Sequence, residues 1–136
     1  MTATLEDWVA AMREAAELLR RVPAGDLDQH RSVRERAVMT LGAMRPTQAI
    51  MDRHFSSVPR VPDLDGLSSV IATVPADELL LHVKNWFSAG RWISDMPARV
   101  HASGAMVAAF DRLADTAHDL TSELDGDRLN AARELG

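Results

Sequence analysis

The sequence contains no cysteine and no tyrosine, and only one lysine among its 136 residues. The absence of cysteine excludes a disulfide scaffold, a zinc site with thiolate ligands and a cysteine nucleophile. No run approaches the roughly 18 apolar residues that a membrane-spanning helix requires. No basic and apolar leader of the signal-peptide type precedes the first amphipathic segment,. A cytoplasmic protein that does not enter the membrane is therefore expected.

Motifs that would indicate a common enzyme class are also missing. The sequence holds no glycine-rich dinucleotide or phosphate loop, no G-x-S-x-G nucleophile elbow and no H-E-x-x-H zinc-protease motif,. Neither internal repeats nor low-complexity stretches occur,. No cofactor is expected on this basis, and the reaction class of any active site stays open.

Charged side chains are distributed unevenly along a chain whose net charge is −5. Residues 29–60 carry six arginines against two acids, a net of +4, whereas residues 61–136 carry twelve acids against six bases, a net of −6. The acidic balance argues against general binding to nucleic acid or an anionic membrane. The basic segment predicts either an anion site or, the favoured interpretation, ion pairs with the acidic C-terminal half. Fourteen arginines to one lysine, with abundant alanine, is typical of a GC-rich bacterial genome.

Apolar residues recur at helical spacing along most of the chain, and no segment alternates as a strand does. In the first helix Trp8 and Met12 share one face, and Thr4 with Asp7 forms a capping box at its start,. Further helices are expected over residues 28–44, 47–56, 64–73 and 75–88. The sequence thus predicts an all-α fold, a compact bundle of five to seven helices in a single domain over residues 1–136.

The longest helix is expected near the C-terminus, over about residues 95–124. Phe110 and Leu113 belong to an apolar series whose members are separated by alternating steps of four and three residues. Such spacing predicts one wall of an antiparallel bundle or the seam of a homodimer. Residues 125–136 are expected to add a short helix that frays at the terminus.

Histidines and carboxylates do not predict a metal centre. None of the five histidines lies three or four residues from another, so no helix presents a histidine pair. Asp111, Asp115 and His118 share one face of the expected long helix and could ligate a cation with help from another helix. That face continues with a carboxylate every four residues, which is more typical of a solvated surface, so no metal is expected.

Residues 64–73 and 75–88 have the lengths of a helix-turn-helix unit. The second of these helices begins with Asp77 and Glu78. Those carboxylates would face the bases and phosphates of DNA, so DNA binding through this unit is rejected.

The most unusual composition lies in residues 82–101, which hold two of the three tryptophans and the only lysine. Gly90 is expected to be left-handed, so that Arg91 and Trp92 are presented at a corner between helices. Arginine and tryptophan are enriched in binding hot spots, and Arg91 is placed to stack between two indoles. For Trp86 burial in the core is favoured, whereas Trp92 suits a core and a site equally. The candidate site residues are Arg91, Trp92, His82, His101 and Trp86.

Two functions fit these features. The first is a non-catalytic binding or interaction protein, expected to be a homodimer, with its site near residues 82–101. The alternative is a small helical enzyme or ligand carrier that acts on an anionic or aromatic small molecule through a cavity lined by arginine and histidine. A filled core with an exposed apolar patch favours the first. A cavity larger than about 300 Å³ reached by these side chains favours the second.

Overall fold

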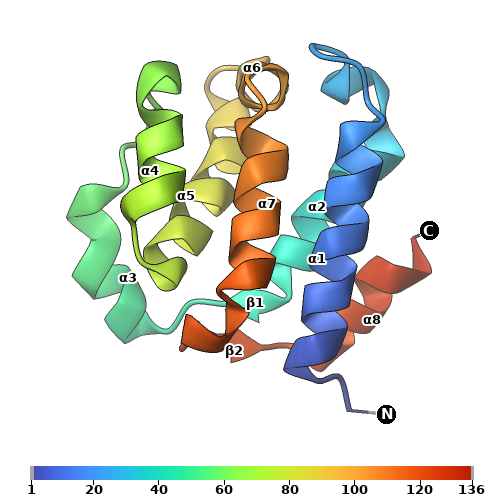
Figure 1. The fold of residues 1–136 in the computed structure, drawn as a ribbon, viewed down its shortest axis with the longest axis vertical. Helices are drawn as coiled ribbons and strands as arrows, with labels where there is room; N and C mark the ends of the chain where they lie inside the picture. The colour runs from blue at the N-terminus through green and yellow to red at the C-terminus, as the bar shows by residue number, and fades with distance from the viewer. Residues whose placement is uncertain (1, 136) are drawn as a thin grey trace.

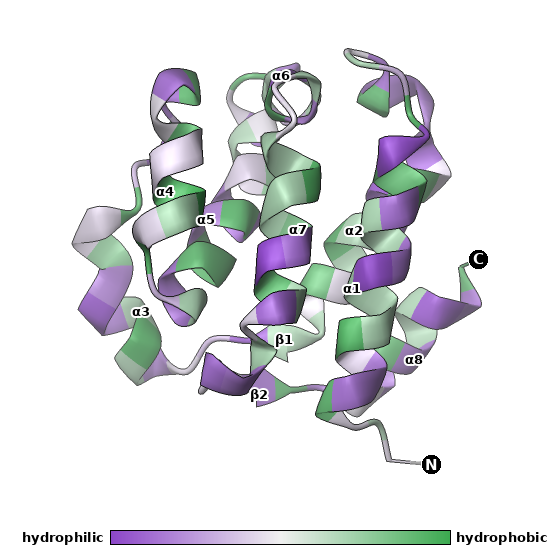
Figure 2. Cartoon of the chain, viewed as in Figure 1, coloured by the Kyte–Doolittle hydropathy of each residue, from purple (hydrophilic) through white to green (hydrophobic). Residues whose placement is uncertain are grey.

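Two helices, α1 (Leu5–Arg20) and α7 (Ala105–Asp115), pack side by side through the middle of the molecule (Figure 1). The computed structural model describes residues 2–135. Both helices are amphipathic, and Figure 2 shows hydrophobic and hydrophilic residues alternating along their turns. Apolar residues of the two facing stripes are buried against one another, which is the usual origin of such a helix pair.

Helix α1 begins as the sequence predicts. The Thr4 side chain accepts a hydrogen bond from the Asp7 backbone N–H, and the Asp7 carboxylate accepts one from the Thr4 N–H at 2.8 Å. Trp8, on the inner face, is fully buried, and its indole N–H donates to the Thr40 carbonyl at 3.0 Å. This bond satisfies the one polar group of the indole and joins α1 to the helix that carries Thr40.

The described residues form eight α-helices, one more than the largest number expected. Six of them, with bounds, are α2 (Arg31–Gly42), α3 (Gln48–His54), α4 (Leu67–Thr73), α5 (Ala76–Ser88), α6 (Met96–Ala102) and α8 (Gly126–Glu134). Five short 3-10 turns connect them, namely η1 (Leu27–Gln29), η2 (Phe55–Ser57), η3 (Leu64–Gly66), η4 (Ala89–Arg91) and η5 (Ala117–Asp119). The all-α class is confirmed in broad terms. Within residues 2–135, no helix combines the length and the apolar character needed to cross a lipid bilayer.

The prediction of one long helix over residues 95–124 is wrong. Gly104 has a φ of +83°, a left-handed conformation that ends α6 and begins α7. Helix α7 ends at Asp115, where the Thr116 hydroxyl turns back to donate to the Arg112 carbonyl at 2.8 Å. The apolar series persists across these breaks because its members still face the core, and Phe110 is fully buried. Periodicity therefore located the buried side but not the continuity of the helix.

Asp77 explains where the chain goes after α7. Its carboxylate accepts hydrogen bonds from the Thr121 backbone N–H at 3.1 Å, the Thr121 hydroxyl at 2.7 Å and the Ser122 hydroxyl at 2.8 Å. These bonds hold the segment between η5 and the next strand against the first turn of α5. A carboxylate that accepts several such bonds is a strong local anchor.

Two strands of two residues each also differ from the expectation of no strand. β1 (Met44–Arg45) pairs antiparallel with β2 (Glu123–Leu124). Two-residue strands are too short for a detectable apolar–polar alternation, so the sequence carries no signal for them. The pair brings the chain to α8, which packs on α2 and buries Leu129 completely.

Candidate functional site

The five residues named from the sequence do not meet in one place. Trp86 lies in the core with 1% of its surface exposed, as favoured for it. His101 is buried where α6 meets α1, with its Nε2 2.8 Å from the Leu19 carbonyl oxygen and its Nδ1 without a partner. Burial lowers the pKa of His101 below its ordinary value. His82 is also buried, whereas Arg91 and Trp92 are exposed.

Gly90 is not left-handed, contrary to expectation, because only Gly25 and Gly104 have positive φ among the described residues. It lies within η4, and a Cβ added there would come 3.2 Å from the Pro97 ring and 3.4 Å from the Arg34 guanidinium. A Cβ at this position would therefore require the Pro97 ring to shift slightly, so glycine favours the close approach of the neighbouring segments and is not required by its backbone conformation.

The cation that stacks on Trp92 is Arg60 and not Arg91. The Arg60 guanidinium lies 4.3 Å from the centre of the indole ring, although the two residues are far apart in sequence. Trp92 remains 66% exposed, so this pair forms part of the surface. The contact has the chemistry expected for the site, but sequence spacing could not identify its partner.

A groove adjoins this contact and holds about 590 Å³. Its lining residues are Met51, Phe55, Val58, Arg60, Leu81 and Asn85. Phe55 is 80% exposed and Met51 42% exposed, so the walls are apolar side chains that face solvent. No prediction from the sequence pointed to this groove.

The two walls of the groove follow from helical spacing. Met51 on α3 and Phe55 just beyond it are four residues apart, as are Leu81 and Asn85 on α5, so each pair projects from one face of a helix,. The segment after η2 closes one end. The Asn85 side-chain amide donates to the Pro59 carbonyl at 2.6 Å, which ties that segment to α5.

Of the six large apolar side chains that are exposed among the described residues, Met51 and Phe55 line the groove, Trp92 stacks on its lining residue Arg60, and Val61 follows Arg60 in the chain. We refer to these four residues and the groove together as the groove surface. Exposed apolar residues scattered singly are normal, whereas clusters of them are more frequent at interaction sites.

Three arginines line the groove surface or adjoin it in the chain, and we call them its basic border: Arg60 lines the groove, Arg53 lies between Met51 and Phe55 in sequence, and Arg91 directly precedes Trp92. Arg53, Arg60 and Arg91 have no carboxylate within 4.0 Å among the residues that the structure describes. The nearby Asp52 is engaged by the Gln48 side chain at 2.8 Å. A positive border on a chain of net charge −5 concentrates anion attraction at one place,.

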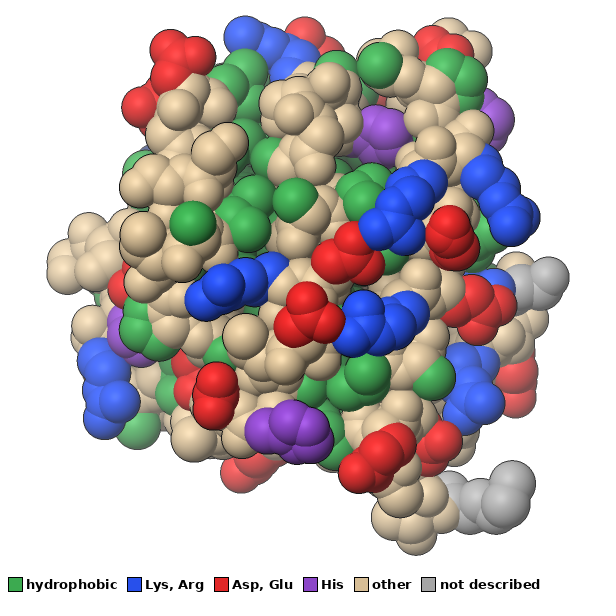
Figure 3. Space-filling view, viewed as in Figure 1, with side chains coloured by type: hydrophobic (Ala, Val, Ile, Leu, Met, Phe, Trp, Pro, Cys, Tyr) green, Lys and Arg blue, Asp and Glu red, His purple; other side chains and the backbone are tan. Residues whose placement is uncertain are grey.

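The arginines of α1 behave differently, because they are paired within the chain. Arg13 contacts Asp115 at 2.6 Å, and Arg20 pairs with Asp111. Figure 3 shows acidic and basic side chains intermingled over α1 and α7. The acidic residues of α7 are thus neutralised by α1 rather than by residues 29–60, and they do not form a metal site.

A buried chain of three titratable side chains lies between α3 and α5. His54 Nδ1 is 3.1 Å from Glu78 Oε1, and His82 Nε2 is 3.3 Å from Glu78 Oε2. The exposed fractions of these side chains are 12%, 13% and 5% for His54, Glu78 and His82. Burial lowers the pKa of His82, and the contact with Glu78 only partly opposes this effect. The four-residue spacing of Glu78 and His82 was a usable signal, whereas the arrival of His54 depends on tertiary packing.

These three residues form a hydrogen-bonded chain and not a metal centre. Each imidazole contacts a different oxygen of Glu78, so the two nitrogens do not converge on one point. Across residues 2–135, no group of three histidine or acidic side chains is arranged to hold a metal ion.

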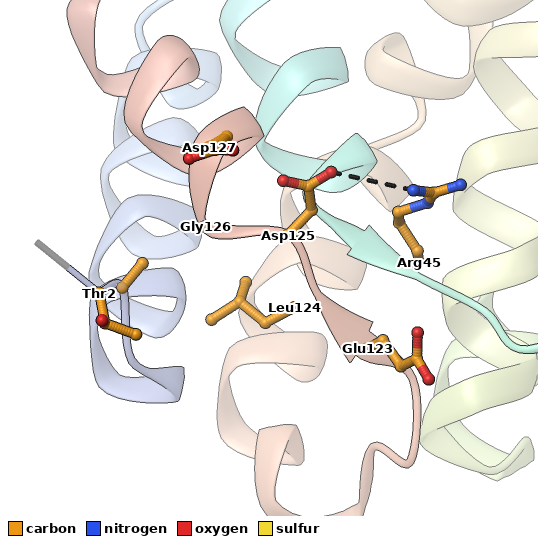
Figure 4. A pocket seen from close by; sticks show the side chains of 8 residues that line it. Thr2, Arg45, Glu123, Leu124, Asp125, Gly126 and Asp127 are labelled. Carbon is orange, nitrogen blue, oxygen red and sulfur yellow. Dashed lines mark ion pairs between the residues drawn. The ribbon is translucent and has the colours of Figure 1, made fainter.

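A second hollow, of about 490 Å³, lies at the N-terminus of α8. Figure 4 shows that the carboxylates of Glu123, Asp125 and Asp127 point in different directions there. Asp125 is already used, since it caps α8 through the Arg128 N–H and lies 3.9 Å from Arg45. This hollow therefore lacks a convergent set of groups for a ligand.

Lys84, the only lysine, is partly buried on α5 near two arginines. Burial lowers its pKa to about 8, and the charges of Arg128 and Arg45 act in the same direction. No hollow described above is lined by Lys84, so the perturbed amine is not itself a site.

Comparisons of the chain with protein-family models, with curated proteins and with solved structures gave no match. The residue types of the groove surface are nevertheless informative. Tryptophan, phenylalanine, methionine and arginine are the side chains enriched at protein interfaces. The groove surface is the part of the described structure with the composition of a binding site.

Proposed function

We propose that the protein is a non-catalytic binding protein that captures an apolar, acidic segment of another protein in the groove between α3 and α5. The observation that carries this proposal is the exposure of Phe55 and Trp92 beside an apolar groove with a basic border. Both aromatic side chains would lose contact with water on binding, and burial of apolar surface is the main driving force of association.

The apolar part of the partner is argued from the walls. Met51, Phe55, Val58 and Leu81 offer no charged group, so they favour aliphatic or aromatic side chains. A volume of about 590 Å³ accommodates one or two such side chains,. Asn85 and the backbone of the Pro59 segment already bond each other, so the groove recognises shape more than polar pattern.

The acidic part of the partner is argued from the border. Arg53, Arg60 and Arg91 lack carboxylate partners among the described residues, and each guanidinium can bind a carboxylate in a forked geometry,. The chain as a whole carries a net charge of −5, so these arginines stand out against an acidic background. The charge pattern thus steers an acidic segment to the groove and makes its binding dependent on salt.

The alternative of an enzyme or carrier with an arginine- and histidine-lined cavity has less support. The groove contains Arg60 but no histidine on its walls, since His54 and His82 face Glu78. The large core side chains, including Trp8, Trp86 and Phe110, are sealed from solvent. A filled core with an exposed apolar cluster is the combination that favours a binding protein.

A homodimer stays a prediction, but its original basis has changed. The expected seam is buried inside one chain, where Phe110 and Leu113 are fully covered. The expected pairing of residues 29–60 with the acidic C-terminal half occurs within one chain, as Arg45 with Asp125 at 3.9 Å, whereas the acids of α7 pair with α1. Self-association through the groove surface would bring two copies of the basic border into one interface, which like-charge repulsion disfavours.

The experiment is selection from a displayed library of random peptides on the immobilised protein, followed by affinity measurement with labelled selected peptides. We expect enriched sequences with one or two large apolar residues flanked by aspartate or glutamate. Phe55→Ala and Arg60→Gln should each weaken binding by about tenfold or more, as for interface hot spots. The matched control is Val38→Ala, because Val38 is an exposed apolar residue on α2 and 40% exposed.

Three results of the selection and affinity measurements would contradict the proposal. The first is that no peptide is enriched; the second is that the enriched peptides carry no acidic residues. The third is that Val38→Ala weakens binding as much as Phe55→Ala does. A dimer seen by light scattering that Phe55→Ala dissociates would also contradict it, because a second copy would then occupy the groove surface.

A further inference from the structure

Helix α3 is attached to the rest of the protein mainly through α5. Figure 1 places it at the edge of the molecule, and its principal packing partners are α5 and its own continuation η2. Ile50 is the single residue of α3 that is buried. A helix held by one neighbour and one buried apolar side chain belongs to the least stable part of a fold, which opens first.

The polar contact across this joint is the chain formed by His54, Glu78 and His82. His54 comes from α3, and the other two come from α5. Met51 and Phe55 lie on the same segment as His54, and Leu81 lies between Glu78 and His82. This contact therefore links the two walls of the groove, beside the hydrogen bond from Asn85 to the Pro59 carbonyl.

Charge balance makes the contact sensitive to protons. The Glu78 carboxylate can balance one imidazolium, but a second would leave an uncompensated positive charge among side chains that are 5% to 13% exposed. An unpaired buried charge is strongly unfavourable. Movement of α3 away from α5 would return His54 to water and thereby remove the unpaired charge from the buried contact.

Within residues 2–135, Glu78 is the carboxylate that pairs with both imidazoles, and no second carboxylate pairs with either. The charged groups that act on His82 are Glu78 and His54. On the same helix, Asp77 is engaged by Thr121 and Ser122, and Lys84 lies near Arg45 and Arg128. Glu78 is thus the single carboxylate in contact with either imidazole among the described residues.

We propose that acidification opens the groove: protonation of both imidazoles of this contact releases α3 from α5 and, with it, the bound partner segment. The identity of what is released rests on the proposed function, but the movement of α3 does not. Two histidines that share one carboxylate thus set the balance between α3 packed on α5 and α3 released from it.

The experiment is hydrogen–deuterium exchange of the free, full-length protein between pH 7.5 and 5, read by mass spectrometry and corrected for the intrinsic pH dependence of exchange. Peptides covering residues 48–57 report on α3, and peptides covering 105–115 report on global unfolding. We expect the open population of α3 to rise about tenfold per pH unit for each proton taken up on opening, while α7 stays protected.

His82→Gln is the decisive variant, because glutamine can still donate to Glu78 but cannot become charged. One histidine then faces one carboxylate, and the acid-induced opening of α3 should disappear. His54→Gln should have the same effect and serves if His82→Gln does not fold. His30→Gln, at an exposed position, should leave the opening unchanged.

Opening of α3 and α7 in parallel would overturn the inference, as would the same opening in both glutamine variants. Because no partner is present, the result is independent of the peptide selection. If α3 opens in acid as expected but the library yields no peptide, the proposed partner is refuted and the movement of α3 is not. A peptide that binds in the groove without acid-induced opening would refute only the movement.

Discussion

The same substitution at two phenylalanines should separate stability from binding. Phe110 is fully buried in the middle of α7, whereas Phe55 is 80% exposed at the groove. Phe110→Ala removes a core side chain, and Phe55→Ala removes a wall of the groove surface. We expect the first to destabilise the protein strongly and the second to leave stability almost unchanged.

The magnitudes follow from the buried area. A buried phenylalanine covers roughly 150–250 Å², which at about 25 cal/mol per Å² corresponds to ~4–6 kcal/mol, an upper bound. Measured costs of Phe→Ala in cores are about 3–5 kcal/mol, and we expect Phe110→Ala to fall in that range. Phe55 buries only about a fifth of its surface, so its truncation should cost at most about 1 kcal/mol,.

Denaturant unfolding of the three proteins, followed by tryptophan fluorescence, measures both values, because Trp8 and Trp86 are buried reporters. A loss under about 1 kcal/mol for Phe110→Ala would show that α7 does not present this face to the core. A loss above about 2 kcal/mol for Phe55→Ala would show that Phe55 is a packing residue, which would remove the main support for the groove surface.

Three further predictions concern backbone conformation and titration. Gly104→Ala should destabilise by about 1–2 kcal/mol because φ there is +83° although a Cβ meets nothing within 4 Å, whereas Gly42→Ala, equally uncrowded but helical, should be neutral or stabilising; denaturant melts compare the two,. Burial lowers the pKa of His101, so near and below pH 6.5 the unfolded chain binds more protons than the folded one. The free energy of unfolding should therefore fall as the pH drops from 6.5. In melts at a series of pH values, His101→Gln should flatten that fall. The pKa of Lys84 is lowered from 10.5 to about 8, so the free energy of unfolding should rise with pH between these values. Lys84→Met should abolish the rise. A rise that persists in Lys84→Met would contradict its assignment to Lys84, since the chain has no tyrosine or cysteine to titrate in this range.

The helices were predictable where their signals are local. The capping box of Thr4 and Asp7 and the spacing of Trp8 and Met12 depend on neighbours within one or two turns, and the structure confirms both. Helix α3 was expected over residues 47–56 and occupies Gln48–His54, with Thr47 as its N-cap through the Ile50 N–H.

The prediction of a long C-terminal helix was wrong because apolar spacing does not detect what interrupts it. Gly104 interrupts the backbone with a left-handed residue, and Asp77 holds Thr121 and Ser122 against α5. The left-handed conformation of Gly104 is a property of one residue, and the contact of Asp77 with Thr121 and Ser122 joins residues more than forty positions apart in the sequence. Neither changes which residues of the apolar series face the core.

The residue types of the candidate site were predicted from the sequence, but their positions and partners were not. An arginine stacked on Trp92 was expected, but the arginine is Arg60, which arrives through the fold and not through helical spacing. Phe55 carried no sequence signal, because nothing in an apolar residue shows that it will face water. His82 was named as a site residue, and its connection to His54 through Glu78 depends on how α3 packs on α5.

The most direct test of the groove as a binding site is the map of backbone amide shifts when isotopically labelled protein is titrated with an acidic peptide from the library. The account predicts that the largest changes lie in residues 51–61 and 81–92, and that they disappear in Phe55→Ala at the same peptide concentration. Changes centred on α1 or α8, or changes that persist in Phe55→Ala, would contradict it.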